Sequence, residues 1–528
     1  MTKKLIALFL ALVTCFSVLA GCTTPPPTGT GGGDDDDHSG LNGKTIQICL
    51  TPIDGLSHND CYLTGAVEEK LGCNLDYNEL DDFGTVYAAS QLSDGSAPDI
   101  TFFSGYNATY EQYGIDEAYI NIYDHLDKMP NVKAYLEANP KLVQMYETED
   151  GCLYVIPKTN VGGSATRNAY LYREDIFAEL GLTWPTNQEQ FEDVLYKLKK
   201  AYPQSFPFIM RNMTGNAQGV QAWSFLWGST HTLSGAYNTI FTLDENGNYY
   251  NGMVSDAYKE MGQYLQWLKA EKLLDPSSYT LTTQTWYEAM ASNRAFITYD
   301  KVDRLPYINM MGQTTQGESF KMVAGKPFNM GSHASKTSEV VTASGSGGAG
   351  GGAGYLYLGD NDNLDVTCKY VDWLFSDDGF VTTNWGIQGE SYEVDENGKK
   401  YFLESFLDKY GTLLPTGLNT NTTGGNWDME AFKGICDEDL IEALELSESM
   451  GVGPRQYNLK YNRAERHIWD TYYKACNEYA RSEWMNMVMG YRAWDEWDDL
   501  KAKLKERYHE DELLAIAKSA LERIPYKD

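Results

Sequence analysis

The chain has 528 residues and a formal net charge of −32 at neutral pH, because 74 acidic residues outnumber 42 lysines and arginines. This charge disfavours nucleic-acid phosphates and anionic lipid headgroups, so we expect no nucleic-acid partner and no membrane contact through the folded body. The length is sufficient for two or more hydrophobic cores.

The first 22 residues, MTKKLIALFLALVTCFSVLAGC, combine two lysines with a short apolar run. The run is too short for a stable membrane-spanning helix and is typical of an export signal. Small residues directly before Cys22 indicate a bacterial lipobox, in which Cys22 is lipidated, for example by palmitate, and becomes the mature N-terminus. An ordinary cleaved signal with an incidental cysteine is the alternative. We expect a lipid anchor on the extracellular face of the cell membrane.

Residues 23–42 follow the lipobox and are rich in Pro, Gly, Thr and Asp. Such a segment cannot bury apolar surface, so we expect a flexible, solvated tether.

Seven cysteines remain beyond Cys22, and none lies in a CxxC spacing. Because seven cannot all pair, we expect buried free thiols, with a Cys49–Cys73 or a Cys61–Cys73 disulfide left open as alternatives.

The N-terminal part of the body alternates strand and helix patterns. This alternation predicts a mostly parallel sheet covered by helices. Ligands of such sheets bind beyond the carboxyl ends of the strands, here the loops 51–54 and 104–107. The expected elements are strands at 44–51, 73–80 and 98–105 and helices at 61–72 and 83–95.

A second α/β region follows, and helices dominate from about residue 366. Thr186 and Glu189 have capping-box spacing, which predicts a helix over 186–202. The other expected elements are a strand within 150–163, a strand and helix in 168–182, a helix over 255–274, a helix and strand in 285–300, and helices over 428–449, 460–490 and 496–523.

These segments carry a resemblance to a known family. Besides the lipobox, the chain contains in order SAPDI (96–100), DGCLYVIP (150–157), LYREDIFAELGLTWPTNQEQFEDVLYKLK (171–199), WLKAEKLLDPSSYT (267–280), YVDWLFSDDGFVTTNWGIQGESYEVDENGKK (370–400) and EWDDLKAKLKERYHEDELLAIAKSALER (496–523). In this order they resemble the extracellular solute-binding lipoproteins of carbohydrate ABC importers, above all the family 1-like subgroup common in Gram-positive bacteria.

The resemblance implies a two-lobed periplasmic-binding-protein-like α/β fold of type II, with a mostly parallel sheet in each lobe and a helical C-terminal extension. The first lobe would comprise 43–158 and 296–355, and the second 159–295 and 356–528. The lobes would close around a sugar, more plausibly an oligosaccharide, and a monomeric protein would deliver it to ABC permease subunits. Neither catalysis nor a cofactor is implied.

Sugar receptors need aromatic faces for the C–H patches of the ring and converging polar groups for its hydroxyls. Trp223 and Trp227 lie at i, i+4, and Trp286 follows a run of Thr and Gln. We expect these three residues and Tyr106, which follows a strand, to bind ligand. Packing of Trp223 and Trp227 into a core is the alternative.

The flexible segment TNVGGSATR (159–167) is the expected crossing between the lobes. Asn160 and Arg167 flank it and are further ligand-binding candidates. Arg167 would bind a sugar hydroxyl or a uronate, or remain solvated.

Trp385 lies in NWGIQGESYEVDENGKKYF, where glycines surround a large aromatic residue. We expect Trp385 to be a stacking platform and Glu390 to accept a hydroxyl, with core packing of the indole as the alternative. Asn397-Gly398 predicts a hairpin turn.

We expect no metal site. Some relatives have a calcium loop after the helix that here ends at Lys200, but residues 201–208 contain no carboxylate. The oxygen-rich segments 244–248 and 359–365 are typical of turns. The GxGxxG spacing from Gly345 to Gly350 lacks the lysine and the helix of a phosphate site.

Two other functions are alternatives to sugar capture. A cell-surface glycan-active enzyme needs two carboxylates across a cleft, and the chain contains neither a nucleophile elbow nor an HExxH motif. A ligand-sensing subunit of a signalling system would have the same fold.

Overall fold

The computed structural model describes residues 41–50, 52, 56–80, 97–103, 113–144, 146–148, 150–158, 168–211, 213, 218–229, 240–244, 246–334, 341–342, 355–411, 413–420, 425–452, 459 and 461–524. Within these ranges, every helix is too short or too polar to cross a bilayer.

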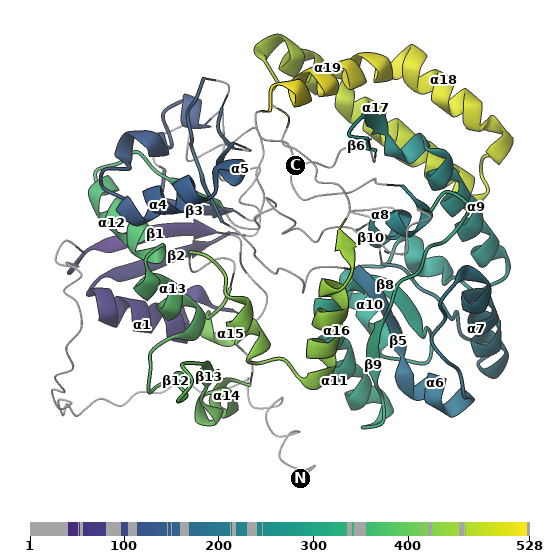
Figure 1. The fold of residues 1–528 in the computed structure, drawn as a ribbon, viewed down its shortest axis with the longest axis horizontal. Coiled ribbons are helices and arrows are strands. Elements are labelled where there is room, and N and C mark those ends of the chain that lie inside the picture. Colours follow the sequence, from purple (N-terminus) through teal and green to yellow (C-terminus); the bar gives the residue numbers. More distant parts are fainter. Residues whose placement is uncertain are drawn as a thin grey trace, which may run out of the picture. The chain divides into compact units, whose positions relative to one another are not determined.

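Two β-sheets, each with its own apolar residues, divide these residues into two lobes (Figure 1). The first lobe contains the described residues within 41–158 and 355–433, and the second contains those within 168–342 and 438–524. The chain therefore passes between the lobes three times.

The first lobe contains a five-stranded sheet of order β2-β1-β3-β11-β4. Strands β1, β2 and β3 run parallel, as the strand–helix alternation predicts, whereas β11 is antiparallel to both β3 and β4. The helix expected at 83–95 lies outside the described residues. The strands are β1 (Thr45–Leu50), β2 (Asn74–Glu79), β3 (Ile100–Phe103), β4 (Ile156–Pro157) and β11 (Tyr355–Leu358), with a hairpin of β12 (Tyr392–Val394) and β13 (Lys400–Phe402). The helices are α1 (Tyr62–Leu71), α4 (Pro130–Ala138), α5 (Pro140–Val143), α12 (Leu364–Leu374), α13 (Asp377–Trp385), α14 (Glu404–Tyr410) and α15 (Met429–Lys433).

The second lobe contains a three-stranded sheet of order β8-β5-β9, in which β5 is antiparallel to both neighbours. This pairing differs from the mostly parallel sheet that we expected. A short strand–helix–strand connection makes the two strands parallel. About 120 residues separate β5 from β8, and a connection of this length allows the two strands to pair in either direction. Phe208 adds parallel bridges to Leu274 and Ile297.

The second lobe has the strands β5 (Asn168–Arg173), β6 (Phe241–Leu243), β7 (Tyr249–Asn251), β8 (Ile297–Lys301), β9 (Met322–Gly325), β10 (Val341–Thr342) and β14 (Gly451–Val452). Its helices are α6 (Glu174–Leu180), α7 (Gln188–Ala201), α8 (Gln218–Ser224), α9 (Asp256–Ala270), α10 (Thr283–Met290), α11 (Leu305–Gln316), α16 (Glu438–Glu448), α17 (Arg463–Met489), α18 (Trp497–Tyr508) and α19 (Glu510–Glu522).

Both faces of this second sheet are buried. Successive residues of a strand point to opposite faces, and Tyr170 belongs to one apolar cluster while Ala169 and Leu171 belong to the other. Helices α10, α11 and α16 cover the face of Leu171, and α7, α8 and α9 contribute to the face of Tyr170 (Figure 1). The helices α17, α18 and α19 add a further layer beside α9.

The predicted lobe assignment is wrong for two segments. We expected 296–355 in the first lobe, but β8 and β9 pair with β5 in the second. We expected 356–528 in the second lobe, but β11 pairs with β3 and β4, and residues from Leu356 to Ala431 join the first apolar cluster. Segments adjacent in sequence usually share a sheet, and a crossing between lobes leaves no local pattern that would reveal the exception.

Several predicted helices are present with shifted ends. The N-cap of α7 is Asn187, whose side chain accepts a hydrogen bond from the Gln190 backbone, whereas we expected Thr186. The helix expected over 496–523 is two helices, because His509 between them has a φ of 58°. The expected hairpin turn is present, and Gly398 supplies its positive φ of 82°.

All seven cysteines among the described residues are free thiols, so neither alternative disulfide is present. Burial raises the pKa of Cys73 to about 11. A thiol with so high a pKa stays protonated and inert at neutral pH.

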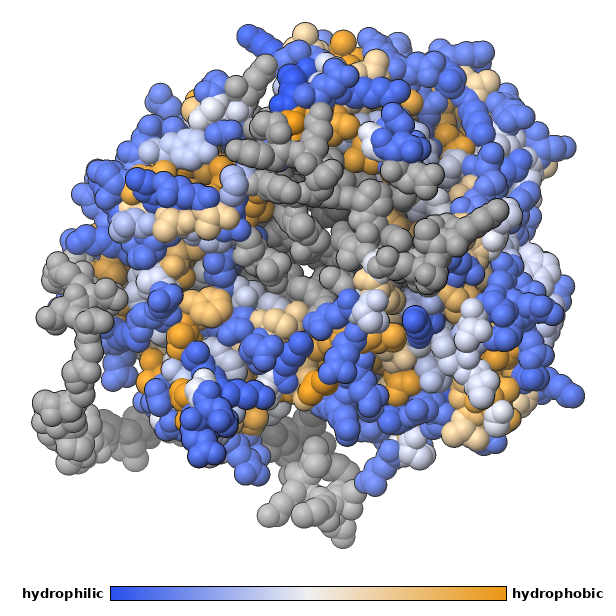
Figure 2. All heavy atoms as spheres, in the orientation of Figure 1, coloured by the Kyte–Doolittle hydropathy of each residue, from blue (hydrophilic) through white to orange (hydrophobic). Residues whose placement is uncertain are grey.

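On the face shown in Figure 2, the described residues are largely hydrophilic, and hydrophobic residues appear in small separate groups. The most exposed large side chains include Tyr491, Met310 and Ile115. Isolated apolar residues of this kind are normal on a soluble surface.

Candidate functional site

Ligands of parallel α/β sheets bind beyond the carboxyl ends of the strands, and this rule applies to the first lobe. In the first lobe, β1, β2, β3 and β4 point the same way, so their carboxyl ends share one edge of the sheet. Most of the loops that follow β1, β2 and β3 lie outside the described residues. The described groups at this edge are His58, Glu79, Phe102 and Lys158.

His58 and Glu79 form a partly buried polar pair at the end of β2. His58 Nδ1 contacts Glu79 Oε1, which also accepts a 3.0 Å hydrogen bond from the His58 backbone nitrogen. The His58 side chain is fully buried, and burial lowers its pKa despite the adjacent carboxylate. Asn59 exchanges two hydrogen bonds with the backbone of Tyr77. Together these contacts fix the chain that enters α1 to the end of β2.

Lys158 follows β4 directly and is almost completely buried. Its ammonium nitrogen lies 4.7 Å from the centre of the Phe102 ring, a cation–π contact. Burial lowers the pKa of Lys158 to about 7. An ammonium group beside an aromatic ring, at the ligand edge of a sheet, is a donor suited to a polar ligand.

In the second lobe, the carboxyl end of β8 carries a guanidinium–carboxylate pair. Arg211 runs alongside β8 and donates from Nε and Nη2 to the two oxygens of Asp300, at 2.9 and 3.0 Å. Its Nη1 donates to Thr283 at the start of α10, and the guanidinium lies over the Trp286 ring. Asp300 is 1% exposed, so the bidentate geometry compensates a buried charge.

Arg304 lies one turn beyond β8 and is less completely paired. Its Nη1 donates to the Tyr287 hydroxyl at 3.2 Å, and its Nε lies 3.2 Å from Asp303 Oδ1. Burial raises the pKa of Asp303 and lowers that of Lys301. We name Arg211, Asp300, Lys301, Asp303 and Arg304 the β8 cluster.

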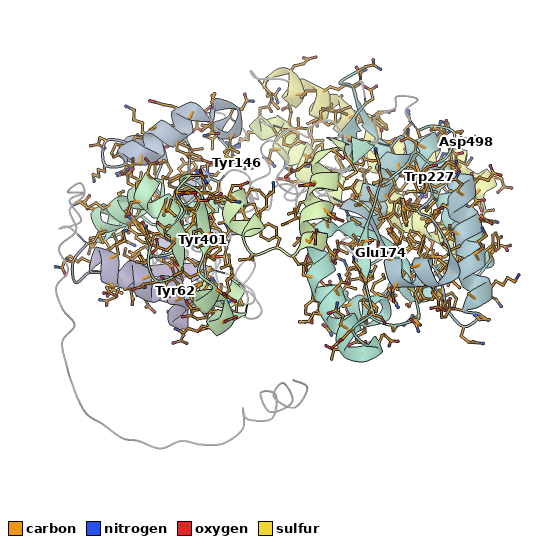
Figure 3. All side chains as sticks on the ribbon, turned by 60° about the horizontal axis from the view of Figure 1, so that its bottom comes forward. Tyr62, Tyr146, Glu174, Trp227, Tyr401 and Asp498 are labelled. Carbon is orange, nitrogen blue, oxygen red and sulfur yellow. The ribbon has the colours of Figure 1, made fainter. Side chains whose placement is uncertain are left out.

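The tryptophans predicted to bind ligand in the second lobe are core residues. Trp223, Trp227 and Trp286 are each at most 1% exposed. Trp223 donates to the Tyr170 hydroxyl at 2.8 Å and packs edge-on against Trp227, which lies within the second lobe in Figure 3. The stacking role is therefore wrong for all three, because an indole buried to this degree presents no exposed ring face to a ligand.

Trp385 is likewise buried, at 3% exposure, and belongs to the core of the first lobe. Its ring stacks on Phe402 at 4.8 Å, and its Nε1 donates to Asp428 at 2.7 Å. The glycine beside it, Gly386, has a φ of 86° and leaves room for the Tyr62 ring. The core alternative for Trp385 is correct, and Gly386 serves this close packing.

Glu390 is exposed and lies 3.3 Å from the hydroxyl of Tyr62, which donates to it. Figure 3 labels Tyr62 in the first lobe, where Tyr62 also contacts Phe406 edge-on. These contacts join α1 to the segment after α13. Tyr106, Asn160 and Arg167 lie outside the described residues, so their predicted roles stay predictions, as does the use of the Gly345–Gly350 segment.

Sequence reasoning missed the charged residues at the two sheet edges. The signal was present, because IMR (209–211) and ITYDKVDR (297–304) each run from buried apolar residues into charged ones. Lys158 after VIP (155–157) follows the same pattern. Charged groups directly after a buried strand mark the edge at which ligands of α/β sheets bind.

Within the described ranges, no three His, Cys, Asp or Glu side chains are placed to hold a metal ion. Segment 244–248 forms the expected turn, in which Asp244 accepts hydrogen bonds from the backbone of Asn246 and Asn248.

Comparison with known proteins identifies a related sequence and related structures. No protein-family model matches the chain. A curated relative is the fructooligosaccharide ABC transporter substrate-binding protein FusA of Streptococcus pneumoniae serotype 4, with 21% identity over 373 residues. The match covers 66% of this chain and 64% of FusA, less than two thirds of the relative's length.

Solved structures align over nearly their whole length. FusA of S. pneumoniae in complex with kestose aligns with a TM-score of 0.70 and 18% identity, over 90% of this chain and 99% of FusA. An HMO-binding, ABC-transporter-associated solute-binding protein of Bifidobacterium longum infantis gives 0.70 and 16%, over 92% and 100%. The alginate-binding protein AlgQ2 gives 0.67 and 20%, over 91% and 98%.

The fold is that of an ABC-transporter solute-binding protein. The type II two-lobed α/β fold predicted from the sequence is thereby confirmed. At sequence identities of 16–20%, the structural likeness establishes the fold and does not identify the ligand.

Proposed function

We propose that the chain is an extracellular solute-binding protein that captures an oligosaccharide and delivers it to the permease subunits of an ABC transporter. The observation that carries the proposal is the likeness to FusA with kestose, which extends over 99% of the FusA chain. The other two structures are named for binding HMO and alginate, so all three neighbours are named for saccharides.

The mechanism that we propose is hinge closure. The chain passes between the lobes three times, and such connections can absorb a change of angle. A ligand that contacts both lobes favours the closed state by its differential affinity, and the permease would recognise that state.

The chemistry of the two sheet edges supports a saccharide ligand. The first-lobe edge presents Lys158 over Phe102, and the second-lobe edge presents the β8 cluster near the half-exposed ring of Tyr307. Charged donors and aromatic rings are what sugar hydroxyls and ring C–H faces require. The named relatives are binding proteins, so the proposal includes no catalytic step.

The first test is a thermal-shift screen of the mature chain with neutral and acidic oligosaccharides, followed by calorimetric titration of each hit. We expect at least one oligosaccharide to raise the melting temperature, to bind stoichiometrically and to reduce the radius of gyration in solution scattering. Monosaccharide units of the hit and a chemically unrelated solute are the controls. A panel without any hit, or hydrolysis of the bound sugar by purified protein, would contradict the proposal.

We further propose that Cys22 is lipidated and that residues 23–42 tether a monomeric body to the extracellular face of the membrane. The lipobox pattern directly before Cys22 supports this proposal. Metabolic labelling with a palmitate analogue should mark the wild-type chain in the membrane fraction, whereas Cys22→Ser should remain unlabelled. Equal labelling of both chains would exclude lipidation at Cys22.

A further inference from the structure

The β8 cluster has a local charge that is opposite to that of the whole chain. It contains three cations (Arg211, Lys301 and Arg304) and two carboxylates (Asp300 and Asp303), and these groups interact electrostatically with one another. When all five are ionised, the cluster has one excess positive charge, in a chain whose net charge is −32. The Arg211–Asp300 and Arg304–Asp303 pairs are then each neutral, and Lys301 carries the excess charge.

Arg211 does not account for the excess positive charge of the β8 cluster. Asp300 takes two of its N–H groups and Thr283 takes a third, and the Arg211 side chain is only 14% exposed. Because this bidentate pair is complete, Arg211 and Asp300 form a fixed, neutral platform at the end of β8.

Arg304 retains unused donors. Its Nη1 is bonded to Tyr287, its Nε is shielded beside Asp303 without a hydrogen bond, and its Nη2 has no hydrogen bond to any described residue. The side chain is 30% exposed. A planar guanidinium with an open edge is the group that pairs best with a carboxylate.

The opposite end of β8 provides an internal reference. Arg294 precedes the strand and donates from Nε and Nη2 to Asp275, at 2.6 and 2.9 Å. This pair also has the Ser277 hydroxyl as a partner, and Asp275 is completely buried. One arginine balances one aspartate there, so a guanidinium–carboxylate pair alone does not indicate a ligand.

An exposed aromatic ring lies beside Arg304. Tyr307 is three residues further along the chain, is 40% exposed and packs edge-on against Tyr287 at 4.5 Å between ring centres. Tyr287 is the residue that accepts the Arg304 hydrogen bond. Arg304 and Tyr307 thus both contact Tyr287. A guanidinium edge and an aromatic ring that share one neighbour match a sugar ring that bears a carboxylate, which offers both an anion and a C–H face.

We propose that Arg304 and Tyr307 form a subsite for the carboxylated ring of an acidic saccharide, such as a uronate oligosaccharide. This inference rests on the proposed function and names the substrate class of the same protein. Arg211 and Asp300 are positioning residues, because they hold the end of β8 and the start of α10 in place.

The test compares uronate oligosaccharides with the same oligomers after chemical reduction of their carboxyl groups to neutral sugars. Calorimetric titration of the full mature chain should give affinity at least about tenfold higher for the acidic form, as expected for one charge-assisted pair. Arg304→Gln should abolish this preference, and Arg304→Lys should retain part of it. Arg294→Gln, at the balanced end of β8, should leave the preference unchanged.

The outcomes separate the inference from the proposed function. Equal or tighter binding of the neutral oligomers, or a preference that survives in Arg304→Gln, would overturn the carboxylate subsite while leaving sugar capture intact. Failure of the wild-type chain to bind any saccharide in either form would overturn both. Circular dichroism and melting temperature of each variant establish that the fold is retained.

Discussion

The two lobes reach the same kind of sheet edge by different topologies. In the first lobe, parallel strands bring their carboxyl ends together, and the edge carries His58, Glu79 and Lys158. In the second lobe, β5 is antiparallel to both neighbours, yet charge gathers at the end of β8. Strand direction therefore does not decide where polar groups collect. What the lobes share is that aromatic side chains fill the interior and charged groups lie where a buried strand ends.

The largest effects should come from the interiors, which we expect to respond alike in the two lobes. Trp385→Ala in the first lobe and Trp223→Ala in the second should each lower the free energy of unfolding by about 3–5 kcal/mol, because a buried indole leaves a cavity. Chemical denaturation measures this loss. If either variant kept its stability and lost only sugar affinity, that tryptophan would be a ligand platform and the lobes would differ.

A smaller effect should distinguish the two charged edges. Asp300→Asn leaves the Arg211 guanidinium without its buried counter-charge and should cost about 3 kcal/mol. Glu79→Gln in the first lobe should cost about 1 kcal/mol, because Glu79 is 26% exposed and its partner His58 is held neutral by burial. Urea denaturation of both variants at pH 7 gives the difference. Equal losses of stability in Asp300→Asn and Glu79→Gln would contradict this difference between the two sheet edges.

A pH dependence of stability comes from Lys158 in the first lobe. The pKa of Lys158 is about 7 in the folded chain and near its ordinary value of about 10.4 in the unfolded chain. Between pH 7 and 10 the unfolded state therefore binds more protons, and this residue makes stability rise with pH. Below pH 7 the ammonium is charged in both states, so its contribution is constant.

Lys158→Met should remove this rise, so its stability advantage over the wild type should shrink from pH 7 to pH 9.5. Denaturation curves at several pH values provide the measurement, and Lys133→Met is the control because Lys133 is 54% exposed. A wild type and a Lys158→Met variant with parallel pH profiles would show that Lys158 is solvated.

Local patterns determined the parts of the fold that depend on neighbours in sequence. The alternation over 44–105 predicted the parallel β1, β2 and β3, and helical spacing predicted α7, α9 and α17. The ordered motifs predicted the solute-binding-protein fold. Each of these inferences uses hydrophobic periodicity or order along the chain, and both are properties of the sequence itself.

Only the tertiary structure decided which lobe β8, β9 and β11 join, because pairing partners can lie more than 100 residues apart. It also decided that Trp385 packs on Phe402 and donates to Asp428 instead of facing a ligand. An indole flanked by glycine looks the same in sequence whether the glycine frees a loop or admits a neighbouring ring. Burial is a property of what surrounds a side chain, and the surroundings of Trp385, like those of Arg304, come from distant segments.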